Sequence, residues 1–438
     1  MNREYDKEQL REALDNFLLA VPGHELASGR VALTCTLYFR NAHLPEVQEA
    51  VCKCAKEYIA LIGPEAKSAI SGSPARFHLA KNGKVTPPRV STFRNAQEKG
   101  RPTALYRVFS HASGAEFDSL PPTFSLYIYM QLNQKYVFSL PMECMTSVFS
   151  AVFAPSFFLL DRSFEEFSAL VHKWCDALRP HSGVAGWGIS THCNEMNSLT
   201  MHGSPARELL RYPGLDYPVI PFFPEDTDTF EEAIASTNWL TILCDELAER
   251  IGGEASLRAL GEGYPLRRYD GGYIIQAGPE PELGDRDEGD FLPQYGKVHD
   301  LLRPLYPPLE ELEYLTSDVS DYDPHTFKRN GDVDADEMLE NFFESWMDRY
   351  APDNVTIPPL FRVPDPEEDD DEDDDEDLEG CRQELAAEAE PPQPPQGDEE
   401  ATRRIEEEWR QKAAAQFETF RAALAAAKRC RESDGRPD

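Results

Sequence analysis

Eleven consecutive acidic residues, Glu367–Asp377, limit what this 438-residue chain can fold into more than any other feature. These carboxylates repel one another and bring no apolar surface to bury, so the run is expected to stay disordered. A proline-rich stretch, residues 391–395, stiffens the same segment. The sequence therefore predicts a folded body, then a disordered acidic and proline-rich linker over residues 365–398, and then one further element.

The charge balance limits the class of partner. The chain has a formal net charge of −36, and residues 365–400 contain 19 acidic residues and one basic residue, so this short stretch carries half of the total. The remaining body is still acidic. Direct nucleic-acid binding through a basic face is therefore not expected. A basic protein partner is favoured, because complementary charge speeds association.

Composition also indicates the compartment. The sequence has no run of about 18 apolar residues, so no membrane span is expected. The charged N-terminus lacks the apolar core of a signal peptide. Nine cysteines are scattered without the spacing of a disulfide framework or a zinc site, which favours reduced thiols. A cytoplasmic protein is the prediction.

Alternating and helical patterns give the fold class. Val31–Phe39 and Thr123–Gln131 alternate apolar and polar residues, as half-buried strands do, and Tyr136–Leu140 is expected to pair with the second. Pro45 opens a helical pattern that ends at Gly63, and Ser163 caps another that runs to Leu178. Further predictions are a helix over residues 5–20, irregular structure over the basic residues 71–102 and a strand over residues 184–190.

Residues 234–285 predict a strand, a helix and a β-hairpin in succession. Ile234–Thr237 is expected to be a short strand, and Asn238 to cap a helix whose apolar stripe runs from Leu240 to Ile251. Asp270-Gly271 is a strong hairpin signal between two strand-like runs. Together these elements predict an α+β fold, a largely antiparallel sheet with helices packed on one face.

Four regions follow from these patterns. An α+β domain is expected over residues 1–306 and a docked extension with an aromatic helix over residues 307–364, the helix being residues 337–350. After the linker at 365–398, residues 399–431 predict an amphipathic helix with an apolar stripe from Ile405 to Leu424. Docking on the same chain, self-association and capture of a partner all remain open for that stripe.

The sequence lacks the parts of a recognisable active site. His181-Ser182 places a base beside a hydroxyl, but neighbours in sequence rarely face each other, and a tight loop is favoured. The spacing of the remaining histidines and cysteines matches no standard zinc pattern, and the acidic residues before the aromatic helix lack the glycine and glutamate of a calcium loop. These candidates are His172, Cys175, His192, Cys193, His202, Asp332, Asp334 and Asp336. No catalytic residue, cofactor or metal is predicted.

Several short motifs recur in an order that resembles the immunity proteins of type VI secretion systems. The motifs are residues 37–40, 181–186, 212–216, 238–241, 252–253, 257–258, 277–279 and 283–285. The resemblance spans residues 29–306, so the extension, linker and terminal helix inherit nothing from it. It implies a cytoplasmic antitoxin that binds a toxin delivered by contact-dependent secretion, often a nuclease.

On this resemblance, the expected function is tight binding of a cognate, basic toxin over its active site, without any enzymatic activity. The acidic loop after the last hairpin is the candidate toxin-binding site, with Asp285, Asp287, Glu288 and Asp290. A plain solvated acidic turn is the competing interpretation of this loop. A structural or adaptor protein that tethers the terminal helix to an assembly is the alternative function.

Overall fold

The computed structural model describes residues 6–20, 27–71, 76–112, 120–133, 146–191, 206–216, 233–306, 345–352 and 399–433. The expected strand at residues 136–140, most of the expected aromatic helix and the acidic linker lie outside these ranges. Among the described helices, none combines the length and the apolar character needed to cross a bilayer.

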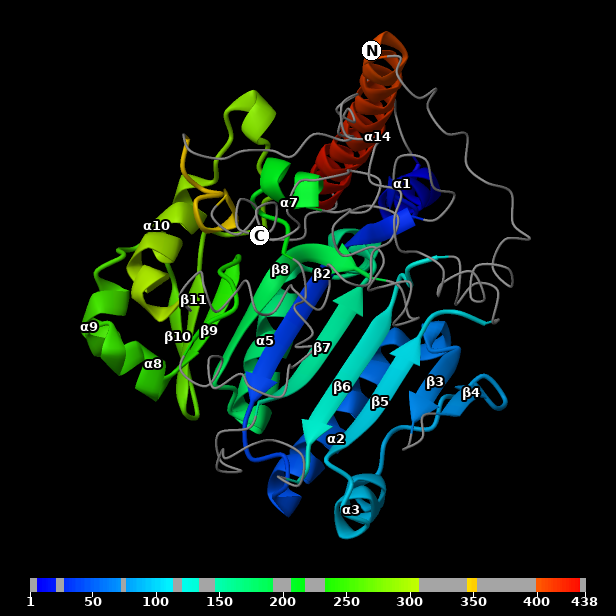
Figure 1. Cartoon of the computed structure of the whole chain (residues 1–438), viewed down its shortest axis with the longest axis vertical. Coiled ribbons are helices and arrows are strands. Elements are labelled where there is room, and N and C mark those ends of the chain that lie inside the picture. Colours follow the sequence, from blue (N-terminus) through cyan, green and yellow to red (C-terminus); the bar gives the residue numbers. More distant parts are fainter. Residues whose placement is uncertain are drawn as a thin grey trace, which may run out of the picture.

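An eleven-stranded sheet organises the body (Figure 1), and every recorded strand pairing is antiparallel. Its order is β10-β11-β9-β8-β2-β7-β6-β5-β3-β4, with β1 paired to β2. The strands are β1 Leu18–Ala20, β2 Ala27–Phe39, β3 Ser68–Ser71, β4 Arg76–Leu79, β5 Thr103–Phe109, β6 Ser125–Gln131, β7 Ser147–Phe153, β8 Ser182–Ser190, β9 Leu240–Cys244, β10 Leu266–Tyr269 and β11 Gly272–Gln276. The predicted α+β class is confirmed.

Helices accompany the sheet. They are α1 Lys7–Asp15, α2 Pro45–Ile62, α3 Val90–Glu98, α5 Phe164–Leu178, α7 Ala206–Arg211, α8 Asp245–Arg250, α9 Gly253–Arg258, α10 Pro293–Leu302 and α14 Glu399–Ser433, with the shorter turns η1 Gly63–Glu65, η3 Phe157–Asp161, η5 Arg286–Glu288 and η6 Arg303–Leu305. Figure 1 shows α2 and α5 behind the same face of the central strands. Trp174 of α5 packs edge-on against Phe149 of β7, at 5.1 Å between ring centroids. The predicted placement of helices on one face is confirmed.

Strand β2 lies at the centre of the sheet and is buried on both faces, where a half-buried strand was predicted. Leu33 and Leu37 face the helices, whereas Thr34 and Thr36 alternate with them and are only 2% exposed. The hydroxyl of Thr36 lies 3.0 Å from that of Ser150 on β7. Because small hydroxyl side chains satisfy one another across the ladder, a polar alternation does not require exposure to water.

The prediction for residues 234–251 was wrong in its element types. Residues 234–237 form no strand, and Leu240–Cys244 is strand β9 rather than the first turns of a helix. The helix begins at Asp245, where the Sγ of Cys244 accepts a hydrogen bond from the backbone N–H of Leu247. A short apolar run fits either period, and the places beside β8 and β11 decide for a strand. The hairpin at Asp270-Gly271 is confirmed.

Two further predictions need correction. Residues 71–102 were expected to be irregular, but they contain the end of β3, β4 and α3. Helix α1 stops at Asp15, because residues 18–20 pair with β2 as β1 and do not continue the helix. Strands β1 and β4 were missed because pairing with a neighbouring strand overrides weak local preference, whereas α3 is a helix that forms within a stretch rich in glycine, proline and basic residues.

The terminal helix, predicted over residues 399–431, is confirmed as α14 and runs over 35 residues. Its C-terminal half packs on the body, with Phe417, Phe420, Ala423 and Ala427 buried. Of the three possibilities left open by the sequence, docking on the same chain is the one observed. In the segment 345–352, Trp346 and Tyr350 are also buried, and the ring of Tyr350 lies 6.0 Å from that of Tyr295 in α10.

Candidate partner-binding site

The core fixes the position of the loop that follows β11. The indole N–H of Trp239 donates to the carbonyl oxygen of Gly278 at 3.0 Å, and that of Trp187 donates to the carbonyl oxygen of Pro281 at 3.0 Å. Both rings are buried. Gly214 packs so closely that a Cβ there would lie 2.0 Å from the carbonyl oxygen of Glu282. These contacts hold the start of the predicted toxin-binding loop rigidly.

Residues 285–290, hereafter the acidic turn, close on themselves. The backbone N–H of Asp285 donates to the carbonyl oxygen of Asp290 at 3.0 Å, and the reverse bond is 2.9 Å. The carboxylate of Asp285 also accepts a hydrogen bond from the N–H of Asp287 at 3.0 Å and caps the short turn η5. Arg286 donates to the carbonyl oxygens of Arg349 and Ala351, which attaches the turn to segment 345–352.

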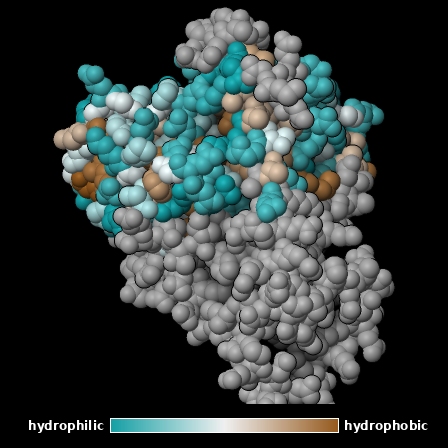
Figure 2. Space-filling model, turned by 90° about the horizontal axis from the view of Figure 1, so that it is seen from above, coloured by the Kyte–Doolittle hydropathy of each residue, from teal (hydrophilic) through white to brown (hydrophobic). Residues whose placement is uncertain are grey.

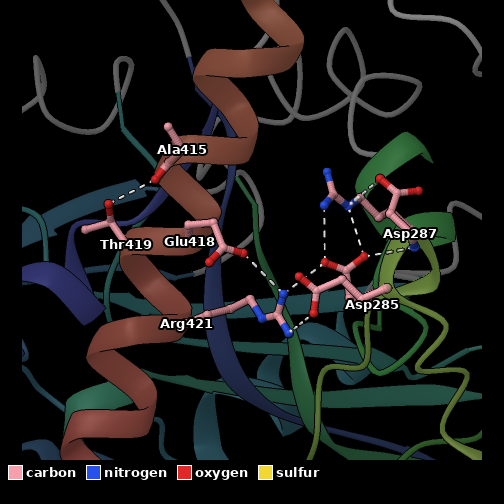
Figure 3. Close-up of polar contacts among 8 residues, drawn as sticks. Asp285, Asp287, Ala415, Glu418, Thr419 and Arg421 are labelled. Carbon is pink, nitrogen blue, oxygen red and sulfur yellow. Dashed lines mark hydrogen bonds and ion pairs between the residues drawn. The ribbon is translucent and has the colours of Figure 1, made fainter. Parts of the chain in front are cut away.

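Asp285 is an internal anchor of the chain. It is fully buried, and its two carboxylate oxygens each lie 3.2 Å from the guanidinium of Arg211 on α7. Arg421 of α14 reaches the same carboxylate at 3.2 Å (Figure 3). Two arginines from distant parts of the sequence thus share one buried acid, so this carboxylate is engaged within the fold.

The other three acidic residues of the turn reach the surface. Asp287 pairs with Arg211 at 3.1 Å, and Glu288 pairs with Arg421 at 2.8 Å. The hydrogen bond from Arg421, together with its charge, lowers the pKa of Glu288. Asp290 is exposed and has no cationic partner among the described residues. Three carboxylates of the turn are therefore exposed to solvent, and among the described contacts only that of Asp290 is not paired with a cation.

Helix α14 completes this site from the other side. Phe417 stacks on Tyr212, the residue directly after α7, with ring centroids 3.5 Å apart, and meets Phe17 edge-on at 4.9 Å. Near its C-terminus, Lys428 lies 3.2 Å from Glu280 and Arg431 pairs with the same carboxylate. Seen from above, the described surface is mainly hydrophilic, with hydrophobic residues scattered over it (Figure 2).

Sequence reasoning missed the two arginines that organise this site. Arg421 lies within the predicted stripe of α14, between Phe417 and Leu424, and a cation on an apolar stripe was the available signal. A side chain there points at the docking surface, so it needs an acidic partner. Arg211 gave no comparable signal, because its partners are 74 and 76 positions away in the sequence.

A second group of polar residues lies where strand β8 begins and strand β9 ends. The Nδ1 of His181 is 3.3 Å from the Sγ of Cys244, and these atoms with a carboxylate oxygen of Glu246 form a group that could hold a metal ion. The guanidinium of Arg40 already contacts two members of this group, at 3.4 Å from the Nε2 of His181 and 3.5 Å from a carboxylate oxygen of Glu246. The neighbouring guanidinium charge disfavours a further cation.

The protonation of this group does not suit nucleophilic chemistry. Burial, with the charges of Arg40 and Arg250, lowers the pKa of His181 to about 3. Burial also raises the pKa of the Cys244 thiol. Both groups are therefore neutral at pH 7, whereas a reactive cysteine needs a thiolate beside a histidine cation.

The structure separates the other sequence candidates. His181 faces Cys244 and not its neighbour Ser182, which begins β8. His172 contacts the carbonyl oxygen of Arg268 at 2.8 Å, while Cys175 is buried in the core. The remaining candidates, at 192, 193, 202, 332, 334 and 336, lie outside the described residues.

Comparison with known proteins gives a family and a fold. A family model named TsiV, described as type VI immunity for VRR-NUC, matches residues 50–329. The solved structure of the Pseudomonas aeruginosa T6SS protein PA0821 is similar with a TM-score of 0.54 at 20% sequence identity, over 77% of this chain and 88% of that one. No curated protein sequence is significantly similar to this chain.

Proposed function

The chain belongs to the TsiV family of type VI immunity for VRR-NUC, and from this we propose that it binds a cognate toxin of the VRR-NUC nuclease type and neutralises it. The observation that carries the proposal is the family match over residues 50–329, which includes strands β3 to β11, α10 and the acidic turn. Neutralisation acts by binding alone and involves no turnover. His181 and Cys244, both neutral at pH 7, offer no thiolate nucleophile.

The proposed mechanism is occlusion of the nuclease active site by the acidic turn. An enzyme that holds nucleic acid attracts phosphates with basic residues, and surface carboxylates can occupy the same positions. The turn is held by the core and by α14, so binding would cost little ordering entropy. Asp290 should contribute most, because a toxin cation would compete with Arg211 for Asp287 and with Arg421 for Glu288.

We place this encounter in the cytoplasm, where a nuclease toxin would meet nucleic acid. The partner is expected to be basic around its active site, in keeping with the net charge of −36. An adaptor that offers α14 to an assembly is less well supported, because Phe417 and Phe420 are already buried against the body.

Co-expression tests the proposal. Cells that express the nuclease domain of the toxin alone should lose viability, and cells that also express this chain should recover. Purified wild-type protein should form a stable complex with the domain and inhibit its cleavage of DNA in proportion to the amount bound. A toxic domain that is neither bound nor inhibited at equimolar or excess protein would contradict the proposed function.

A further inference from the structure

Positively charged residues follow the edge strand β4 in the sequence, whereas the chain as a whole is strongly acidic. Six cationic residues occur between Leu79 and Arg101, on the turn after β4, on α3 and beside it, against one acid, Glu98. We call these six residues the basic edge: Lys81, Lys84, Arg89, Arg94, Lys99 and Arg101. Figure 1 shows β4 at the outer edge of the sheet and α3 apart from it, and Lys81 and Lys84 face each other in the turn that follows β4.

The charges of the basic edge are not used within the described fold. All six side chains are exposed, and none takes part in an ion pair with the described residues. Elsewhere Arg211 and Arg421 meet acidic partners, as expected for a chain with 79 acidic and 43 basic residues. Lys81 and Lys84, which face each other in one turn and have no acidic partner among the described residues, attract an anionic partner.

The backbone beside these charges is open to pairing. β4 is the outermost strand and pairs only with β3 among the described strands. The N–H of Ala80 donates to the carbonyl oxygen of Lys67 on the β3 side at 2.8 Å. Because backbone groups alternate along a strand, the N–H of Leu79 points away from the sheet. The Leu79 side chain is 54% exposed, which is unusual for a leucine in this fold.

We propose that this edge is a second docking surface for the toxin, and that it receives an extended segment of the toxin with both acidic and apolar residues as an added strand on β4. The inference rests on the proposed function for the identity of the partner. Main-chain hydrogen bonds to β4 provide affinity, contact with Leu79 fixes the register, and Lys81 and Lys84 select an acidic sequence.

Two other anionic occupants fit these features less well. The run Glu367–Asp377 can supply charge, but it contains no apolar residue to cover Leu79, and acidic residues are poor strand formers. Nucleic acid can pair with cations but not with a strand edge. Phe93 is the only phenylalanine, tyrosine or tryptophan from Leu79 to Arg101, and it is buried, so no ring is available there for stacking on a base.

Toxin affinity measured with full-length variants tests the inference. Lys81→Glu/Lys84→Glu should weaken binding about tenfold at low salt, with a smaller effect at high salt. Leu79→Pro should weaken it at both, since it removes the outward N–H and spares the bonds to β3. Lys53→Glu/Lys56→Glu, an equal charge change on exposed residues of α2, is the matched control and should change affinity less than twofold.

Each outcome separates this inference from the proposed function. Wild-type protein that fails to bind or inhibit the toxin would remove both. Wild-type binding that both edge variants retain, with unchanged thermal unfolding, would overturn the docking surface alone. Loss of binding to a labelled DNA duplex in Lys81→Glu/Lys84→Glu, without loss of toxin affinity, would overturn it in favour of nucleic acid. Tighter toxin binding after replacing residues 367–377 with serine, with no effect of Leu79→Pro, would overturn it in favour of the acidic run.

Discussion

The ring of Phe417 lies parallel to that of Tyr212, with 7° between the planes. This contact joins the terminal helix to the residue directly after α7, across a sequence separation of about half the chain. Tyr212 belongs to the part of the chain that matches the family, whereas Phe417 lies beyond it. The terminal helix is thus built into the body of the fold, and its removal would expose aromatic surface.

Replacement of this ring tests how firmly α14 is held. Phe417→Ala should lower the free energy of unfolding by about 3 kcal/mol, because a buried phenylalanine is exchanged for a cavity. Urea denaturation followed by tryptophan fluorescence measures the change. Thr419→Ala, on the exposed side of the same turn, is the control and should stay within about 0.5 kcal/mol of wild type. Equal effects of the two substitutions would show that the helix does not depend on this contact.

Asp285 should matter for stability more than for binding. Asp285→Ala removes the shared partner of Arg211 and Arg421 and the cap of η5, which should cost roughly 2–3 kcal/mol. Thermal and urea unfolding measure this loss. Asp290→Ala in the same turn, exposed and without a cationic partner in the described part, should change stability by less than about 0.5 kcal/mol. Similar stability of the two variants would contradict the assignment of Asp285 as an internal anchor.

Asp290 carries the corresponding prediction for binding. Asp290→Arg should slow association with the toxin roughly tenfold at low salt, because it replaces the free carboxylate of the turn with a like charge. The effect should diminish as salt screens the charges. Surface plasmon resonance measures both rates. Glu262→Arg, at an exposed acid on a different loop, is the matched control, and an equal slowing there would mean that only net charge matters.

Acid sensitivity should depend on His299. Burial, with the charges of Arg349 and Arg303, lowers its pKa to about 3 in the folded protein. In the unfolded chain, the imidazole of His299 binds a proton below about pH 6.5, whereas in the folded protein it stays neutral down to about pH 3. The contribution of His299 to stability is therefore complete above pH 6.5 and declines as the pH falls toward 3. Between these two pH values, the free energy of unfolding should fall by up to about 1.4 kcal/mol for each pH unit.

His299→Gln should therefore flatten the dependence of unfolding free energy on pH between pH 6 and 5, whatever its effect at pH 8. Urea unfolding at several pH values gives the slope. His78→Gln, at an exposed histidine, is the control and should keep the wild-type slope. An unchanged slope in His299→Gln would contradict the neutral, buried state of this imidazole.

Local patterns were sufficient to predict much of this fold. The stripe from Val47 to Leu61 and the cap at Ser163 predicted α2 and α5, because helix signals are contained within one segment. Strand β9 was mistaken for a helix, since Leu240 and Leu243 have helical spacing and only its neighbours β8 and β11 make this apolar run a strand. Strand β4 was missed for the same reason, as its pairing partner determines it.

The candidate site was harder to predict from sequence. The acidic turn was located by its carboxylates, but its internal division, with Asp285 inside and Asp290 outside, depends on arginines far away in the chain. The pair of His181 and Cys244 was likewise invisible, because 63 positions separate two residues that adjacent strands bring together. Contacts of this kind depend on the order of the strands in the sheet, which cannot be read from the spacing of residues along the sequence.

The indole N–H groups of Trp187 and Trp239 hold the chain just before residue 285 by its carbonyl oxygens, not by its side chains. Because these hydrogen bonds are made to the backbone, they do not depend on which side chains follow in residues 285–290. Asp287, Glu288 and Asp290 could be exchanged for a different set of surface residues while the turn kept its place. The two tryptophans thus keep the turn in one position whatever side chains it carries. Substitutions in the turn alone would then be enough to change which toxin is recognised, with the rest of the fold unchanged.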